Sequence, residues 1–516
     1  MGTLFPWNVF ITERAYFDVR LFVPPYTPAL ANSFESIFGV AYMVTNLAAL
    51  AALVRAGGVD RLSPFAQVPA PLLGMAALLA LTGGLACAPS LSGDATMGVT
   101  LATLLAMGAL TAVVQGGSFA VASVLPPVYN QALMGGQAAA GVVSAAVAMA
   151  STLTLSGRGG DDDTGGKGLE GDDAGPAAGA AAGAEAAAYF LVAAALVLAC
   201  AVGCLFLHGV PFYRHHALVA LAARSSPADD ARDSGGGRGH GRGRRRNARD
   251  SDLGSGADRG GEMDDSDAPT APLLGRGDVV NGCDSDAGSE DGGAEDTGYG
   301  LGRDADEESG EDVIAHRAPS SSSSESATTE VACYRAAVLV TFALTLSVFP
   351  AVTSSICSAR NPAVTPPCVP DPPGAGGRFF GDLWVPFFFV VFNVMDLFGR
   401  CAAGVWPKKP PSGRAVLALA IARLALLPPL LMCNVVTAGQ WDVPRLLATS
   451  DLAPAVLISA LAFTNGHVAS TCMMFGPALV PLGQRAEEGS KMSLAVVVGL
   501  ACGSVLSFVV TAGLQS

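Results

Sequence analysis

Long apolar runs constrain this chain more than any other feature. About 20 mostly apolar residues suffice for a helix to cross the hydrocarbon core of a bilayer. The runs here are rich in Ala and Leu and do not alternate with polar residues, which favours helices over membrane strands. The segments of this kind are 1–22, 33–54, 69–90, 97–125, 131–156, 184–208, 332–356, 383–406, 414–436, 452–474 and 492–514. The sequence therefore predicts an all-α membrane protein with eleven transmembrane helices.

Composition supports this class, and one segment departs from it. The 516 residues are 51% hydrophobic and only 14% charged, which is unusual for a soluble protein of this size. The first segment, 1–22, reaches Glu13 and Arg14 after about a dozen apolar residues, which is short of a full span. Either this helix is broken or the sequence lacks residues upstream of it, and we favour the second interpretation.

The charged residues gather in one block, 225–331, which is rich in Gly, Ser, Asp and Arg. The block has too few apolar residues to form a core whose burial would offset the conformational entropy lost on folding. We therefore predict that it is disordered. Six helices before a long loop and five after it are typical of a two-bundle transporter. The predicted organisation is an N-terminal six-helix bundle at 1–208, a disordered loop at 209–331 and a C-terminal five-helix bundle at 332–516.

Positive charge in short loops predicts orientation. The loops assigned to the inner side contain Arg55, Arg61, Arg214, Arg224, Lys408, Lys409, Arg414, Arg485 and Lys491. We therefore expect a multi-pass protein, in the plasma membrane, with a cytoplasmic N-terminus and long loop and an extracellular C-terminus. An arginine cluster at 242–246 could contact anionic membrane lipid, although a solvated linker is the favoured interpretation. Nothing indicates binding to nucleic acid.

Signatures of enzymes and metal sites are missing from the sequence. It contains no Cys-x-x-Cys pair, no His-Glu-x-x-His, no Gly-x-Ser-x-Gly and no Walker A motif. We therefore expect no catalysis, no metal and no cofactor. Cys357 and Cys368 flank a proline-rich loop and could form a disulfide.

The stretch FNVMDLFGR places an aspartate and an arginine inside an apolar segment. Asp396 and Arg400 are four residues apart on one helix face, and Asn393 lies on the same face one turn earlier. A lone charge at mid-bilayer costs about 2.5–3.5 kcal/mol on insertion scales, so the pair needs polar surroundings. From the residues alone, two interpretations stay open: a binding face that looks into a cavity, and an intrahelical bridge that only stabilises the bundle.

Other polar residues in the apolar segments have weaker signals. Gln115 offers a donor and an acceptor that suit the edge of a base, or an interhelical hydrogen bond. Trp7 could stack on a flat ligand or anchor at the membrane interface. His467 and Arg423 are assigned structural roles. Glycines that predict close helix contacts are Gly116, Gly117, Gly136, Gly141, Gly499 and Gly503.

Together these segments resemble one known family, the equilibrative nucleoside transporters (solute carrier 29 type). The similar stretches are GTLFPWNVFITERAYFDVRL, QGGSFAVASVLPPVYNQALMGGQAAAG, VFPAVTSSI, FNVMDLFGR, ARLALLPPLLMCNVV and FTNGHVASTCMMFGP, in the family's order. The resemblance covers nearly all membrane segments and excludes the long loops. It implies eleven helices in a fold related to the major facilitator type, and movement of nucleosides down their gradient by alternating access.

The resemblance also implies roles for particular residues. Asp396 and Arg400 would bind the ribose, and Gln115 and Trp7 the base. The resemblance places three further residues at the substrate, Leu4, Leu47 and Asn393. It places three at the gates of the cavity, Ile11, Phe349 and Pro350. Two alternatives remain: a proton-coupled carrier of nucleosides or free bases, and a membrane scaffold or receptor that acts through the inner loop. The oligomeric state is left open.

Overall fold

The computed structural model of the chain describes residue 10 and the ranges 16–17, 20–32, 34–59, 62–87, 91–155, 176–224, 321–360, 378–405, 409–435 and 446–515. These residues belong to one compact unit, 1–235 with 319–516. A second unit, Gly236–Ala318, lies outside the described residues.

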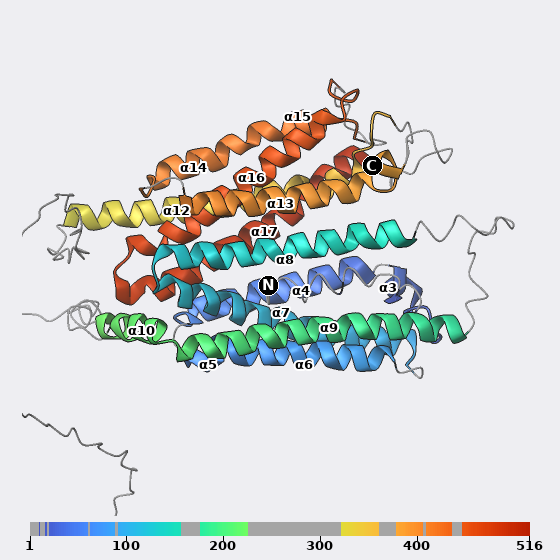
Figure 1. The fold of residues 1–516 in the computed structure, drawn as a ribbon, viewed down its shortest axis with the longest axis horizontal. Coiled ribbons are helices and arrows are strands. Elements are labelled where there is room, and N and C mark those ends of the chain that lie inside the picture. The colour runs from blue at the N-terminus through green and yellow to red at the C-terminus, as the bar shows by residue number, and fades with distance from the viewer. Residues whose placement is uncertain are drawn as a thin grey trace, which may run out of the picture. The chain divides into compact units, whose positions relative to one another are not determined.

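Every regular element in the described residues is helical, apart from a single bridge between Ile356 and Val435. The α-helices are α3 (Pro28–Asn32), α4 (Phe34–Arg55), α5 (Pro64–Gln67), α6 (Pro69–Ala86), α7 (Gly93–Ser123), α8 (Pro127–Leu155), α9 (Pro176–Gly209), α10 (Pro211–Arg224), α12 (Ser321–Val348), α13 (Trp384–Val405), α14 (Gly413–Ala422), α15 (Leu427–Leu431), α16 (Leu452–Phe475) and α17 (Arg485–Gln515) (Figure 1). Short 3₁₀ turns are η3 (Thr353–Ser355), η4 (Arg378–Phe380), η5 (Arg423–Leu426), η6 (Pro477–Leu479) and η7 (Leu482–Gln484).

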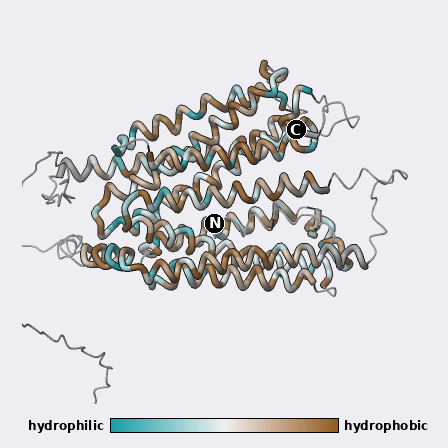
Figure 2. Tube along the Cα trace, viewed as in Figure 1, coloured by the Kyte–Doolittle hydropathy of each residue, from teal (hydrophilic) through white to brown (hydrophobic). Residues whose placement is uncertain are grey.

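Ten helices in the described part of the chain are long and apolar enough to cross a membrane. They coincide with ten of the predicted segments, from 33–54 to 492–514, and Figure 2 shows how apolar residues dominate along them. The predicted class, an all-α membrane protein, is confirmed. Most of the first segment, 1–22, lies outside the described residues, so an eleventh spanning helix stays a prediction. Phe10 and Phe17 of that segment are buried in the core.

Local sequence signals explain where many helices begin. Proline at the first helical position has no N–H to leave unpaired and already has a helical φ. Helices that begin at a proline include α5, α6, α8, α9 and α10. Ser63, Ser92 and Ser412 each cap a helix by accepting a hydrogen bond from the main-chain N–H three residues later. Prolines and serines in the connections therefore divide one apolar run from the next.

Two helices extend into the interval 209–331, which the sequence assigned to the loop. Helix α10 follows α9 directly, and α12 begins at Ser321. Tyr213 and Ala220 of α10 are buried, because PFYRHHALVALAAR places apolar residues on one helical face after a favourable proline. The prediction of disorder for 225–331 is wrong for 321–331, which belong to α12. Residues 225–320 lie outside the described residues.

The connection after α12 contains the disulfide-bonded Cys357. Its N–H donates to the main-chain oxygen of Asn434 at 2.9 Å, and Asn434 Nδ2 donates back to the Cys357 oxygen at 3.1 Å. The partner sulfur lies outside the described residues, so the suggested bridge to Cys368 stays a prediction.

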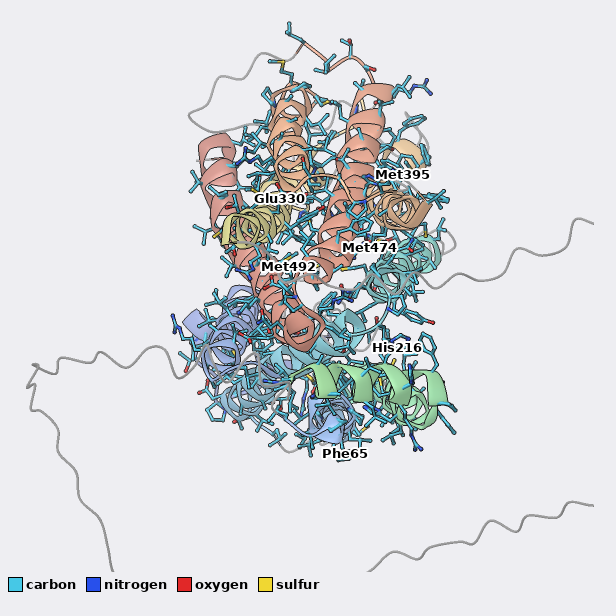
Figure 3. All side chains as sticks on the ribbon, turned by 90° about the vertical axis from the view of Figure 1, so that its left-hand side faces the viewer. Phe65, His216, Glu330, Met395, Met474 and Met492 are labelled. Atoms are coloured by element: carbon cyan, nitrogen blue, oxygen red, sulfur yellow. The ribbon has the colours of Figure 1, made fainter. Side chains whose placement is uncertain are left out.

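The helices form an N-terminal and a C-terminal group, which contact each other through α8 and α17. Helices α4, α6, α7 and α9 pack together, and α8 joins this N-terminal group through its contact with α7; α12, α13, α14, α16 and α17 form the C-terminal group. Between the groups, α8 packs against α13 and α16, and α17 packs against α7 and α4. Seen from the α10 end in Figure 3, Met492 of α17 lies near the boundary between the groups. It shares a core cluster with Phe119 of α7 and Met134 of α8.

Glycines allow the closest helix crossings. A Cβ atom at Gly466 of α16 would overlap the main-chain oxygen of Asp396 on α13, and one at Gly399 would overlap that of Phe463. Predicted close contacts are confirmed at Gly116, Gly117, Gly141, Gly499 and Gly503. At Gly136 no residue of another described element lies within 4 Å of the Cβ position, so close packing there stays a prediction.

We expect Gly466→Ala to destabilise the protein, because the added methyl group must separate α13 from α16. Overpacking of this kind costs about 1–3 kcal/mol. Gly203→Ala on α9 is the matched control, since nothing in the described residues lies within 4 Å of its Cβ position. Thermal denaturation of the detergent-solubilised protein, followed by size-exclusion chromatography, should show a lower melting temperature for Gly466→Ala only. Equal melting temperatures would contradict the close crossing.

Candidate functional site

The ion pair predicted within α13 is formed. Arg400 Nε donates to Asp396 Oδ2 at 2.7 Å, one helical turn away. Both residues are buried, with exposures of 6% for Arg400 and 5% for Asp396. Burial removes water from both charges, so the pair must find further hydrogen-bond partners in the protein.

A second donor holds the other carboxylate oxygen of Asp396. Asn465 Nδ2, from α16, donates to Asp396 Oδ1 at 2.7 Å. The Thr345 hydroxyl, from α12, lies 2.9 Å from Asn465 Oδ1 and donates to it. Two donors from two helices therefore fix the orientation of this carboxylate, at the crossing that Gly466 makes possible.

Arg400 connects the ion pair to the N-terminal group of helices. Its Nη1 donates to the main-chain oxygen of Met134, on α8, at 3.0 Å. Next to this contact, Gln131 Nε2 donates to the main-chain oxygens of Arg400 and Cys401 at 3.0 and 2.9 Å. The charged pair therefore lies where the two groups meet, and does not face the lipid.

A second buried arginine belongs to the same polar cluster. Arg423, in η5, is 2% exposed and donates to Thr345 Oγ1 at 2.6 Å and to the Thr341 oxygen at 2.9 Å. It also donates to the Leu461 oxygen at 3.1 Å and to Thr464 Oγ1 at 3.0 Å. The sequence predicts only a structural role for Arg423. The structure adds that Arg423 is connected to the Asp396 carboxylate through Thr345 and Asn465.

Gln115 lies on α7 at a depth similar to that of the ion pair. It is 8% exposed and one turn from Phe119, which shares a core cluster with Met134. At a rise of 1.5 Å per residue, Gln115 lies about 12 Å from the end of α7, and Asp396 about 14 Å from the end of α13. Both helices end on the side of α10 (Figure 1). No hydrogen bond joins Gln115 to the pair in the described residues.

Asn393 lies where α13 meets α8, and Leu47 lies where α4 meets α17. Asn393 Nδ2 donates to the Phe389 oxygen at 2.8 Å, and its amide oxygen lies against Gly141 of α8. Leu47 of α4 packs on a small cluster that includes Val497 of α17. Leu4, Trp7 and Ile11 lie outside the described residues.

Two of the three residues predicted as gates, Phe349 and Pro350, directly follow the last residue of α12. The Phe349 ring stacks on that of Phe392 of α13, with centroids 3.8 Å apart, and lies 5.0 Å from that of Phe389. Pro350, next in sequence, is exposed. Phe392 precedes Asp396 by one turn, so this aromatic cluster lies on the side of the ion pair away from α10 (Figure 1).

On the α10 side of the ion pair, α17 packs closely against α7. Gly489 of α17 lies against the main-chain oxygen of Phe119, and Ser490 Oγ donates to the Gly116 oxygen at 3.4 Å. One cavity of about 180 Å³ lies at the α10 end, and another of about 210 Å³ lies beside His467, between α14 and α16. Asp396, Arg400 and Gln115 line neither of them.

Sequence reasoning missed Gln131, Thr345 and Asn465. The signal for Asn465 was present, because an amide in an apolar helix, directly before a glycine at a close crossing, must find a partner. A hydroxyl such as that of Thr345 gives a weaker signal, because it can bond to its own helix instead. Among the residues that the structure describes, no three His, Cys, Asp or Glu side chains gather as a metal site.

The fold and this site define a multi-pass integral membrane protein with a buried charged cluster at the contact between two helical groups. The family model described as nucleoside transporter matches residues 101–236 and 298–512. The chain belongs to the nucleoside transporter family, which is a family of transporters and not of enzymes.

Curated relatives extend over almost the whole chain. The chain is 25% identical to mouse equilibrative nucleoside transporter 1, over 99% of this chain and 95% of the relative. It is 24% identical to human equilibrative nucleoside transporter 2, over 98% and 94%. A shorter alignment with human equilibrative nucleoside transporter 1 is 32% identical over 32% of this chain and 33% of the relative.

Two solved structures of sugar symporters align with the chain at low sequence identity. The proton:xylose symporter XylE aligns with a TM-score of 0.49 and 10% identity, over 99% of this chain and 86% of that one. The fucose:proton symporter FucP from E. coli aligns with a TM-score of 0.45 and 13% identity, over 99% and 90%.

A double-mutant cycle tests whether the two charges depend on each other. Removing one partner of a buried pair leaves an uncompensated charge and costs about 3–5 kcal/mol. We therefore expect Asp396→Ala to destabilise the protein more than the double variant Asp396→Ala with Arg400→Ala. Melting temperatures in detergent measure the difference. Additive losses in the double variant would show that the pair is not coupled.

Proposed function

We propose that this protein carries nucleosides down their gradient across the membrane, by alternating access between its two helical groups. In this proposal Asp396 and Arg400 bind the ribose, and Gln115 and Trp7 bind the base. Membership of the nucleoside transporter family supports the class of substrate. The observation that carries the proposal is the buried Asp396–Arg400 pair at the contact between the groups.

The hydrogen-bonding capacity of Asp396 matches a ribose. A carboxylate has about four acceptor positions, two on each oxygen. Asn465 occupies one position on Oδ1 and Arg400 one on Oδ2. One position on each oxygen remains, and a ribose presents two neighbouring hydroxyl protons. The guanidinium of Arg400 can donate to the hydroxyl oxygens in the same complex, in charge-assisted hydrogen bonds.

The base would lie on the α7 side of the ribose. Gln115 can donate and accept, so its amide suits the edges of both purines and pyrimidines. Trp7 would stack on the base, while Leu4, Leu47 and Asn393 complete the cavity. A few hydrogen bonds and one stacking contact give weak binding, which a carrier needs for release.

Gates would close the cavity on each side in turn. We assign Ile11, Phe349 and Pro350 to the gate away from α10, where Phe349 already stacks on Phe392. The contacts of Gln131 and Gly489 between the groups belong to the opposite gate. We keep the predicted order of an N-terminal bundle (1–208), a long loop (209–331) and a C-terminal bundle (332–516), with α10 and the start of α12 as helical parts of the loop interval. We propose a plasma-membrane protein with its N-terminus and long loop in the cytoplasm and its C-terminus outside.

Asp396→Ala and Arg400→Ala should each abolish uptake of uridine, because each removes half of the ribose site. The measurement is uptake of radiolabelled uridine by cells that lack their own nucleoside transport, normalised to the amount of protein in the membrane. Phe398→Ala is the matched control on the same helix, since Phe398 is 59% exposed. Wild-type uptake should be insensitive to a protonophore. Unchanged uptake in the Asp396 and Arg400 variants, at equal membrane levels, would refute the site.

Gln115→Ala should raise KM about tenfold, because a buried hydrogen bond to the base is lost. The increase should differ between adenosine and uridine, whose edges present different donors and acceptors. Gln115 could instead serve helix contact alone. In that case the variant would lower the melting temperature and the amount of protein in the membrane, and leave KM unchanged for both nucleosides.

A further inference from the structure

A chain of buried hydrogen bonds connects Arg423 to the carboxylate of Asp396. Arg423 Nη2 donates to Thr345 Oγ1 at 2.6 Å, and Thr345 donates to Asn465 Oδ1 at 2.9 Å. Asn465 Nδ2 then donates to Asp396 Oδ1 at 2.7 Å. Thr345, Asn465 and Arg423 are 1%, 3% and 2% exposed, so the partners of their polar atoms come from the protein. All donors in this chain point toward the carboxylate.

The direction of the Thr345 proton depends on Arg423. The hydroxyl has one proton and two acceptors at 2.9 Å, Asn465 Oδ1 and the main-chain oxygen of Thr341. The Thr341 oxygen already accepts the helical N–H of Thr345 and Nη1 of Arg423 at 2.9 Å. Its two lone pairs are therefore occupied. Because Nη2 of Arg423 also donates to Thr345 Oγ1, the hydroxyl proton is directed to Asn465.

The Thr345 proton and the Asp396 carboxylate select the same orientation of the Asn465 amide. The two ends of an asparagine amide have nearly the same shape, so the hydrogen-bond partners select the orientation. With its oxygen accepting from Thr345, the amide presents its NH₂ to Asp396. The opposite orientation would set the amide oxygen against a carboxylate oxygen, which is repulsive. The chain therefore fixes one donor on Oδ1 and leaves the remaining positions of Asp396 open.

We propose that Arg423, Thr345 and Asn465 are positioning residues that preset Asp396 to accept the two hydroxyls of a ribose. The inference rests on the function proposed above and deepens it. In this proposal the preference for ribose over deoxyribose depends on the Asp396–Arg400 pair, which binds the sugar. It also depends on the three positioning residues, which do not contact the sugar. Loss of the chain weakens binding of the hydroxyls and leaves binding of the base unchanged.

Thr345→Val tests the inference, because valine keeps the shape of threonine and loses the hydroxyl. Thr345→Ser is the conservative variant that keeps it. Uptake of uridine and of 2′,3′-dideoxyuridine is measured for both variants and wild type, in cells without their own nucleoside transport. We expect Thr345→Val to raise KM for uridine about tenfold while KM for the dideoxy analogue stays within about twofold. Thr345→Ser should retain the wild-type ratio.

Two results would overturn the inference. In one, Thr345→Val changes KM by the same factor for both nucleosides; in the other, it lowers only the maximal rates, as a purely structural role predicts. Asn465→Leu, which removes the donor to Asp396 directly, makes the same comparison if Thr345→Val does not reach the membrane. If wild-type protein carries uridine and its dideoxy analogue equally well, the ribose site of the proposed function is itself wrong. If instead the wild type prefers uridine and Thr345→Val keeps that preference, only the positioning role of the chain is refuted.

Discussion

The burial of charge inside an apolar helix bundle is the constraint on which the rest of this structure depends. Asp396 and Arg400 have little access to water, so the protein must supply the hydrogen bonds that water would have made. The partners come from α8 and α16, and Thr345 of α12 in turn donates to the α16 partner, Asn465. The hydrogen bonds of these two side chains therefore join α13 to α8 and to α16.

Close helix approach and charge stabilisation depend on each other here. An asparagine side chain is short, so Asn465 can reach the carboxylate only if α16 and α13 nearly touch. Gly466 and Gly399 permit this, because a Cβ atom at either position would overlap the backbone of the facing helix. The dipeptide Asn465–Gly466 thus supplies both the donor and the space that the donor requires.

The sequence predicts local features of this protein better than the partners of its buried polar groups. Apolar runs of about 20 residues define the spanning helices, and a spacing of four residues brings Asp396 next to Arg400. Asn465 and Thr345 come from segments 69 and 120 residues away from their partners in the chain. No periodicity relates such positions, because they meet only after the helices have packed. For the same reason Arg423 was recognisable as a buried cation, while its connection to Asp396 was not.

The two buried arginines have different tasks in the proposed transport cycle. The acceptors of Arg423 lie on α12 and α16, so its hydrogen bonds hold the C-terminal group together. Arg400 bonds to Asp396 in its own helix and to Met134 across the boundary between the groups. When the groups move apart, the bond to Met134 must break, whereas those of Arg423 need not change. Arg400 would then have a donor free for a ribose hydroxyl. Arg423 would keep the carboxylate of Asp396 in place. In this proposal the site therefore uses two arginines with one carboxylate, because one arginine binds substrate and the other holds the carboxylate.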